Sequence, residues 1–287
     1  MPPRFFLKPW GRTHPCVLTL GEATLEAQQV GGAKPARKMR ALPGMAYFSM
    51  LNRSNIQMIF FDAAGTLFEV RGSVGEIYAR VARPYGFEAA PEEIERRFAR
   101  EFRRQPPLAF PPRTPEAERL VLEREWWRDL VRAVFAELGP FPRFDEFFVE
   151  VFELFRGREG WRLYEDVAPA LAALKEHGLR LGVISNFDSR LDDVLRALRL
   201  DHYFGAVHLS SREGAAKPDP AIFQAALAQN AIAPSQALHV GDSWREDAEG
   251  AAAVGIYPVL LDRRGRFTEA DHLTRLTRLD QLVELLV

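Results

Sequence analysis

The sequence predicts an α/β protein: a doubly wound, parallel, Rossmann-like sheet with an inserted α-helical cap. After residue 57, short apolar runs alternate with helix-like stretches, which is typical of βαβ units. One long interval between the first run and the others has helical spacing of apolar residues and no convincing strand. A chain of 287 residues is long enough for such a core and a second domain.

The apolar runs are the predicted strands. The first, Met-Ile-Phe-Phe-Asp at 58–62, is followed by the turn-like Ala-Ala-Gly-Thr. A continuous apolar run bounded by a turn suits a strand that is buried on both faces of a parallel sheet. Four more runs are Leu179 to Ser185, Ala206 to Leu209, Ala237 to Val240 and Ile256 to Leu261. Helices are expected at Val167 to His177, Ser189 to Leu198, Pro220 to Gln229 and Arg245 to Val254.

The interval 72–162 is the predicted cap. Helical spacing appears in Ile94, Phe98 and Phe102 and again in Leu130, Val134 and Leu138, while the proline-rich loop 105–115 divides the two parts. We expect a bundle of four or so helices here. The α/β core would then comprise residues 57–71 and 163–287.

Residues 1–56 form a basic leader. Residues 1–57 carry eight Lys or Arg against Glu22 and Glu26 alone, and the segment lacks a hydrophobic signal region. We expect a disordered extension, or a start codon placed before the true one at Met45, Met50 or Met58. An organelle transit peptide is the alternative, which the low serine content disfavours.

Charge and cysteine usage narrow the class of protein. The 38 basic and 39 acidic side chains nearly cancel, which predicts neither nucleic-acid nor membrane partners. No stretch approaches the roughly 20 apolar residues of a spanning helix. The single Cys16 leaves the body without a disulfide or a thiol nucleophile and favours a cytoplasmic setting. We expect a monomer or a homodimer that acts on a small molecule.

Polar side chains close the predicted strands. Asp62, Ser185 and Asp242 each stand where an apolar run ends, and Lys217 lies in the loop after another run. Ligands of open α/β sheets bind outside the carboxyl ends of the strands. These four side chains are therefore the candidate site.

Four ordered motifs carry a resemblance to the haloacid dehalogenase superfamily of hydrolases. They are Asp-Ala-Ala-Gly-Thr at 62–66, Ile-Ser-Asn at 184–186, Lys-Pro-Asp-Pro at 217–220 and Gly-Asp-Ser-x-x-x-Asp at 241–247. Together with Trp126-Trp127, they look most like a little-characterised branch similar to human haloacid dehalogenase-like hydrolase domain-containing proteins. The tryptophan pair either lines a substrate pocket or, as is more common for such pairs, belongs to the cap core.

The resemblance implies a role for each motif residue. Asp62 would be the nucleophile, which splits one displacement into two easier ones, and a ligand of Mg²⁺. Asp242 and the backbone carbonyl of Ala64 would complete the protein ligands, with Asp247 in the second shell. Substrate oxygens would be bound by Thr66, Ser185, Asn186 and Lys217, the lysine offsetting negative charge.

Ala64 departs from the pattern of the superfamily's phosphatases. These usually carry an acid two residues after the nucleophile, where it protonates the leaving oxygen and then activates water. A positioned acid or base typically contributes about a hundredfold to ten-thousandfold. We therefore expect a phosphatase-type hydrolase that prefers good leaving groups, such as acyl phosphates.

There are three alternatives to a phosphatase-type hydrolase. Phosphonoacetaldehyde hydrolases also lack the acid but use a cap lysine, and no lysine occurs between Lys38 and Lys175. A metal-free 2-haloacid dehalogenase would match residues 62–67 but not Gly241-Asp242. Such an enzyme also needs a cap arginine, and the candidates are Arg96, Arg97, Arg103 and Arg104. A catalytically weak binding or regulatory protein is the third reading.

Overall fold

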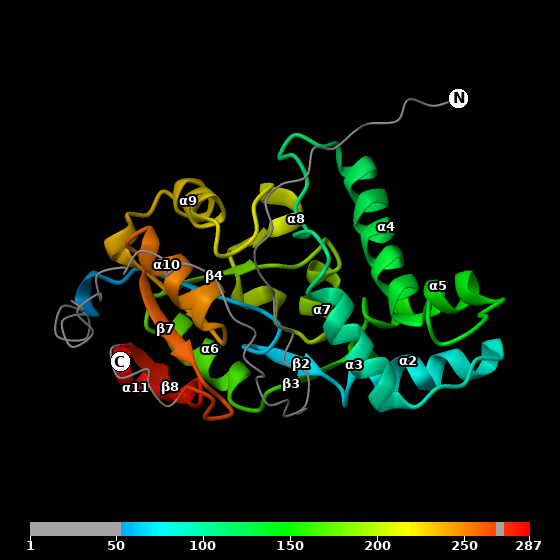
Figure 1. Cartoon of the computed structure of the whole chain (residues 1–287). Coiled ribbons are helices and arrows are strands. Elements are labelled where there is room, and N and C mark those ends of the chain that lie inside the picture. The colour runs from blue at the N-terminus through cyan, green and yellow to red at the C-terminus, as the bar shows by residue number, and fades with distance from the viewer. Residues whose placement is uncertain (1–52, 268–272) are drawn as a thin grey trace, which may run out of the picture.

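The computed structural model describes residues 53–267 and 273–287 (Figure 1). Most of the predicted disordered leader, residues 1–52, therefore lies outside the described residues. Its last residues are part of the fold: η1 (Arg53–Asn55) is a 3₁₀ turn and Ile56 is 7% exposed. The ordered chain thus includes residues that we had assigned to the leader.

A six-stranded parallel sheet forms the centre of the fold. Its strand order is β5-β4-β1-β6-β7-β8, so the chain winds outward in both directions from β1. This arrangement confirms the predicted doubly wound α/β fold. The last strand, β8, was not anticipated. The strands are β1 (Met58–Phe61), β4 (Arg180–Ser185), β5 (Ala206–Leu209), β6 (Ala237–Gly241), β7 (Tyr257–Leu261) and β8 (Thr274–Leu276).

Both faces of β1 are covered by helices. Successive side chains of a strand point to opposite faces. Ile59 and Phe61 belong to the apolar cluster with α6, α7 and α11, while Met58 and Phe60 belong to the cluster with α9 and α10. This explains why the run is continuously apolar. The helices are α6 (Val167–Glu176), α7 (Leu191–Ala197), α8 (Ser210–Glu213), α9 (Pro220–Gln229), α10 (Gly250–Ala253) and α11 (Asp280–Leu286), with 3₁₀ turns η4 (Asp201–Tyr203) and η5 (Pro234–Gln236).

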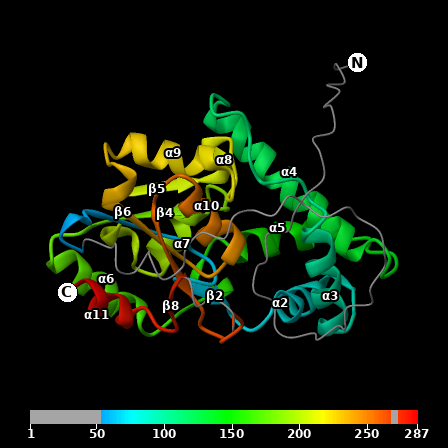
Figure 2. The ribbon, with the colours of Figure 1, turned by 60° about the vertical axis from the view of Figure 1, so that its left-hand side comes forward.

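Four helices, which we call the cap helices, lie to one side of the sheet in both views (Figures 1 and 2). Their own apolar cluster joins Ile77, Phe98, Leu130 and Phe147, all nearly inaccessible. The longest, α4, carries charges along its length, and no helix in the described ranges is long and apolar enough to cross a membrane. The cap helices are α2 (Val74–Ala82), α3 (Pro91–Phe102), α4 (Glu116–Phe135) and α5 (Phe144–Leu154), with turns η2 (Arg83–Tyr85) and η3 (Arg158–Gly160).

A two-stranded ribbon connects the cap helices to the core. Here β2 (Phe68–Val70) pairs antiparallel with β3 (Trp161–Leu163), and the rings of Phe68 and Trp161 lie 5.0 Å apart. β3 overlaps only the end of the interval 72–162, for which no strand is predicted, and β2 is not among the predicted strands. Strands of three residues leave too little periodicity to detect, and the partner of each lies some ninety residues away.

Candidate active site

Three predicted site residues meet at the carboxyl edge of the sheet. β1 lies between β4 and β6 and is parallel to both. Asp62 follows β1, Ser185 is the last residue of β4, and Asp242 follows β6. Parallel strands end at the same edge of a sheet, so these side chains converge. All three are at least nine-tenths buried.

Lys217 is directed at the Asp62 carboxylate. Its Nζ donates to Asp62 Oδ1 at 2.6 Å, and the Ser185 hydroxyl donates to the same oxygen at 3.0 Å. The side chain of Asn186 holds the lysine in place by exchanging two hydrogen bonds with the backbone of Lys217, at 2.7 and 3.0 Å. Asn186 therefore positions Lys217, and its amide is already engaged. Its predicted contact with the substrate stays a prediction.

Asp247 lies behind Lys217. Its Oδ1 accepts from Lys217 Nζ at 2.6 Å and lies 2.9 Å from His239 Nε2, while its Oδ2 accepts from the backbone N–H of Ser243. Burial alone would raise its pKa, but the Lys217 ammonium and His239 together outweigh this effect and hold the pKa well below its usual range. A π-helical turn, η6 (Trp244–Glu249), presents this carboxylate where we had expected an α-helix. Such turns frequently occur at functional sites.

The three acids form a cluster suited to a cation. One oxygen each from Asp62, Asp242 and Asp247 lies within 4.8 Å of the others. Burial, reinforced by Asp62 and Asp247, raises the pKa of Asp242 to about 7. Lys217 is shared by the other two acids, and Asp242 is paired only with Arg266 Nη2 at 3.2 Å among the residues described. Hard oxygen donors with surplus negative charge fit Mg²⁺.

Two glycines allow this close approach. Gly65 has φ +90°, and a Cβ placed on it would lie 2.7 Å from the Asp242 carboxylate. A Cβ on Gly241 would lie 2.1 Å from the Asp247 carboxyl carbon. Both positions therefore require glycine, because any side chain would displace a candidate ligand.

Thr66 and Ala64 differ in their access to the site. Thr66 is fully buried and is not among the residues that line the cavity above the acids, and its hydroxyl has no hydrogen-bond partner within the described part of the chain. Its backbone carbonyl accepts from Arg263, which also pairs with Asp166. The predicted hydrogen bond from Thr66 to substrate stays a prediction. Ala64 does line this cavity, which is expected of a residue at the position of the catalytic acid in the superfamily's phosphatases.

A cavity of about 1340 Å³ opens above the acids and extends beneath the cap helices. The lining includes both Trp126 and Trp127, so this pair contributes to the wall as well as to the cap's apolar packing. Of the candidate arginines, Arg103 and Arg104 line the cavity, whereas Arg96 and Arg97 pair with Glu93.

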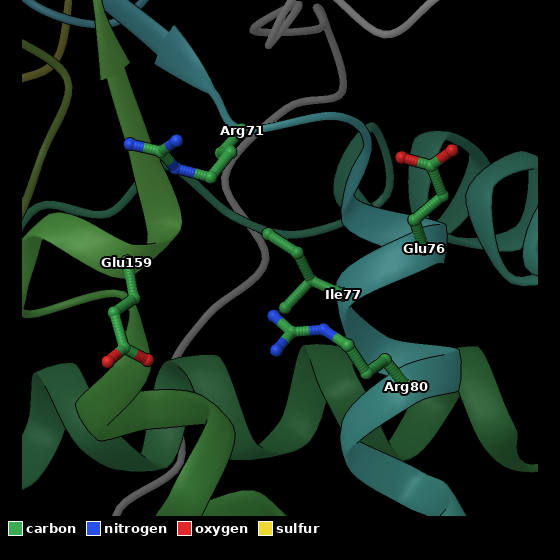
Figure 3. A pocket seen from close by; sticks show the side chains of 5 residues that line it. All are labelled: Arg71, Glu76, Ile77, Arg80 and Glu159. Carbon is green, nitrogen blue, oxygen red and sulfur yellow. The ribbon is translucent and has the colours of Figure 1, made fainter.

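A second hollow, of about 600 Å³, lies where the β2–β3 ribbon joins α2 (Figure 3). Its walls are Arg71, Glu76, Ile77, Arg80 and Glu159. None of these belongs to the four motifs, and Glu76 is engaged in the capping box of α2 with Ser73. The chemistry of the chain is therefore placed in the larger cavity.

Three site residues were missed in the sequence. His239 was hidden inside an apolar run, although a histidine two residues before Gly241-Asp242 is a usable signal. Arg263 and Arg266 follow β7, and no spacing rule connects them to Thr66 or Asp242. Their contacts depend on the path of the loop that follows β7.

Comparison with known proteins agrees with this geometry. The family model described as haloacid dehalogenase-like hydrolase matches residues 56–255. Haloacid dehalogenase-like hydrolase domain-containing protein 3 of Mus musculus is 34% identical over 218 residues, which cover 74% of this chain and 84% of that protein. The phosphoserine phosphatase of Thermus thermophilus is 34% identical over 152 residues, 52% of this chain and 60% of that protein.

Solved structures share the fold at low identity. A HAD phosphatase from Thermococcus onnurineus has a TM-score of 0.54 and 22% identity, and an L-2-haloacid dehalogenase from Xanthobacter autotrophicus has a TM-score of 0.60 and 17% identity. Each alignment covers 80% of this chain and 98% of the other. Phosphatases and dehalogenases thus resemble this fold about equally.

Proposed function

Because this chain belongs to the haloacid dehalogenase-like hydrolase family, we propose that it is a magnesium-dependent hydrolase in which Asp62 attacks the phosphorus of a small phosphorylated metabolite. Residues 72–162 would act as the cap over this site. We further propose an acyl phosphate, or another phosphate with a good leaving group, as the substrate.

The observation that supports this proposal is the environment of Asp62. The carboxylate lies at the base of the cavity, with Lys217 Nζ and Ser185 Oγ both directed at its Oδ1 and with Asp242 beside it. Two donors orient the group as a nucleophile, and Lys217 offsets the charge that develops during transfer. A surface carboxylate or a helix cap would not need a buried lysine.

The reaction has two displacements. First, an oxygen of Asp62 forms a bond to phosphorus while the bond from phosphorus to the leaving oxygen breaks, and an acyl phosphate releases a carboxylate anion. Next, water attacks the same phosphorus, the bond to Asp62 breaks, and both water protons remain on the product as dihydrogen phosphate. The first displacement does not require an acid at position 64 when the leaving anion is stable.

The acidic cluster would hold the magnesium ion through Asp62, Asp242 and the Ala64 carbonyl. When bound, this ion neutralises repulsion between the carboxylates and the phosphoryl oxygens and orients the substrate. Asp247, with its short contact to Lys217, keeps the lysine charged: burial alone would lower the pKa of Lys217, but the two carboxylates raise it well above its usual range.

The test is hydrolysis of acetyl phosphate and para-nitrophenyl phosphate by the purified protein with Mg²⁺. We expect turnover by the wild type, and a loss of at least about a thousandfold in Asp62→Asn, because the nucleophile is removed. Asp201→Asn is the control: Asp201 is an exposed aspartate, so this variant should retain full activity. Equal rates for wild type and Asp62→Asn would refute the proposal.

Dehalogenation is the second candidate, because Ala64 suits a leaving halide and two cap arginines line the cavity. Halide release from 2-chloropropionate in excess chelator would support it. The metal-competent cluster that includes Asp242 favours the phosphatase reading. A protein that binds phosphate ligands tightly without turnover would instead support a regulatory role.

A further inference from the structure

The cap side of the cavity is mostly aromatic and apolar, and its charged members are Arg103 and Arg104. Its lining residues include rings from α3, α4 and α5 and from the loop 103–112. Every acidic residue of the described lining, by contrast, comes from the core. A substrate held at Asp62 would therefore direct its leaving group toward a wall without carboxylates. Such a wall offers an ammonium group no carboxylate, only the faces of its rings.

Three partly exposed rings are the centre of this wall. Trp126 and Trp127 meet edge to face at 5.0 Å, and Phe102 lies 5.8 and 6.2 Å from them. We call these three residues the aromatic wall. They come from two different helices, α3 and α4, so their meeting is a product of helix packing.

The polar atoms of the aromatic wall are already satisfied. Trp126 Nε1 donates to the carbonyl of Pro106 at 3.0 Å, and Trp127 Nε1 donates to Asp188 Oδ2 at 2.5 Å. Neither indole N–H is left to bind a hydroxyl. What the two residues offer to a ligand is the surface of their rings.

The nearest buried cation is neutralised in the same way. Arg190 donates to both oxygens of Asp188, at 3.0 and 2.7 Å, and to the carbonyl of Phe152. Its guanidinium packs over the rings of Phe152 and Trp127, 3.9 and 5.0 Å from their centroids. Arg190 thus packs against Trp127, and its charge is compensated by Asp188.

From these contacts, and resting on the proposed function, we infer that the leaving group of the substrate carries an aromatic ring that packs on Trp126, Trp127 and Phe102. Stacked or edge-to-face rings gain energy beyond burial alone. A sugar would bury several hydroxyls against a wall whose donors are taken, which is unfavourable. The class that fits is an aromatic acyl phosphate or aryl phosphate.

Ala64 is consistent with the same class. An aromatic carboxylate or a phenolate departs as a stabilised anion, whereas a sugar or serine alkoxide needs the proton that position 64 does not supply. The methyl group of Ala64 also belongs to the cavity lining. The wall and the missing acid therefore select the same leaving group through independent physical effects.

Binding of phosphonates, which are not hydrolysed, tests the inference without turnover. With Mg²⁺ present, we expect calorimetry to show benzylphosphonate binding at least about tenfold more tightly than methylphosphonate, because a ring is buried. Equal affinities would overturn the inference. Phe102→Ala should reduce the preference for benzylphosphonate.

Phe141 supplies the matched control. Phe102 and Phe141 are both partly buried phenylalanines in the aromatic packing of the cap, but only Phe102 lines the cavity. Phe141→Ala should keep the full preference. If either alanine variant fails to fold, Phe102→Leu and Phe141→Leu replace the pair. An equal loss of preference in both members of the pair would overturn the inference.

Hydrolysis of benzoyl phosphate and acetyl phosphate separates this inference from the proposed function. We expect kcat/KM to favour benzoyl phosphate by about tenfold or more. Equal hydrolysis of both would refute the aromatic wall's role and leave the proposed function intact. Tight benzylphosphonate binding without hydrolysis of either would refute the proposed function and support the aromatic site.

Discussion

The ammonium group of Lys217 lies 2.6 Å from Asp62 Oδ1 and is almost completely buried, at 4% exposure. The same nitrogen is 2.6 Å from Asp247 Oδ1. One lysine thus compensates two buried carboxylates at the base of the cavity. The consequences of removing that charge, or of changing its surroundings, can be measured.

Lys217→Met should abolish activity and destabilise the fold. Removing one partner of a buried ion pair typically costs about 3–5 kcal/mol, because the remaining charge is uncompensated. Urea unfolding and phosphate release measure the two effects. Lys175→Met is the control: Lys175 is exposed, donates to the His202 carbonyl and lies 6.0 Å from the centroid of the Tyr203 ring, so both properties should remain near wild type. Wild-type stability of Lys217→Met would contradict the pairing.

Ala64→Asp should raise turnover of alkyl phosphate monoesters by about a hundredfold to ten-thousandfold, because it restores a proton donor to the leaving oxygen. The gain should be much smaller on acetyl phosphate. Ala64→Asn matches the size of the aspartate without its proton transfer and should give no gain. A gain of equal size in both variants would exclude acid catalysis as its cause.

Gly65→Ala should remove magnesium-dependent activity. The new Cβ would lie 2.7 Å from the carboxylate of Asp242 at a φ of +90°. Gly86→Ala is matched, because Gly86 has φ +77° with no atom within 4 Å of a Cβ. Left-handed strain should cost each variant about 1–2 kcal/mol. Only Gly65→Ala should lose activity, and loss in both would mean that strain alone is responsible.

The pKa of about 7 at Asp242 predicts how stability depends on pH without metal. The pKa of Asp242 in the folded protein exceeds its value of about 3.9 in the unfolded chain. The stability that protonated Asp242 contributes is therefore lost as the pH rises from about 3.9 to about 7. In EDTA, the melting temperature should fall more for the wild type than for Asp242→Asn between pH 5 and 7, and it should level off above pH 7. If the melting temperatures of the two proteins changed in parallel with pH, the raised pKa of Asp242 would be contradicted.

Magnesium should reverse this loss in the wild type. Binding of the ion requires ionised carboxylates, so the gain in melting temperature should grow with pH up to about 7 and then become constant. Asp242→Asn should gain little at any pH. Equal gains in both proteins would place the ion elsewhere.

The sequence alone indicated five of the six strands of the sheet and the members of its polar edge. Asp62, Ser185 and Asp242 end continuous apolar runs, and parallel strands end at one edge, so the sequence placed all three at that edge. The order β4-β1-β6, which the structure shows, makes them neighbours. The local signal was sufficient because each run was continuously apolar, buried on both faces and closed by a polar residue.

Tertiary structure decided the rest. The salt bridge of Arg266 to Asp242, the hydrogen bond of Arg263 to the Thr66 carbonyl, and the meeting of Phe102 with Trp126 and Trp127 depend on how loops and helices pack. Helical spacing indicates which face of a helix is apolar, but not what that face contacts. Packing between residues far apart in the sequence therefore determined which side chains line the cavity, and no local sequence pattern predicts such packing.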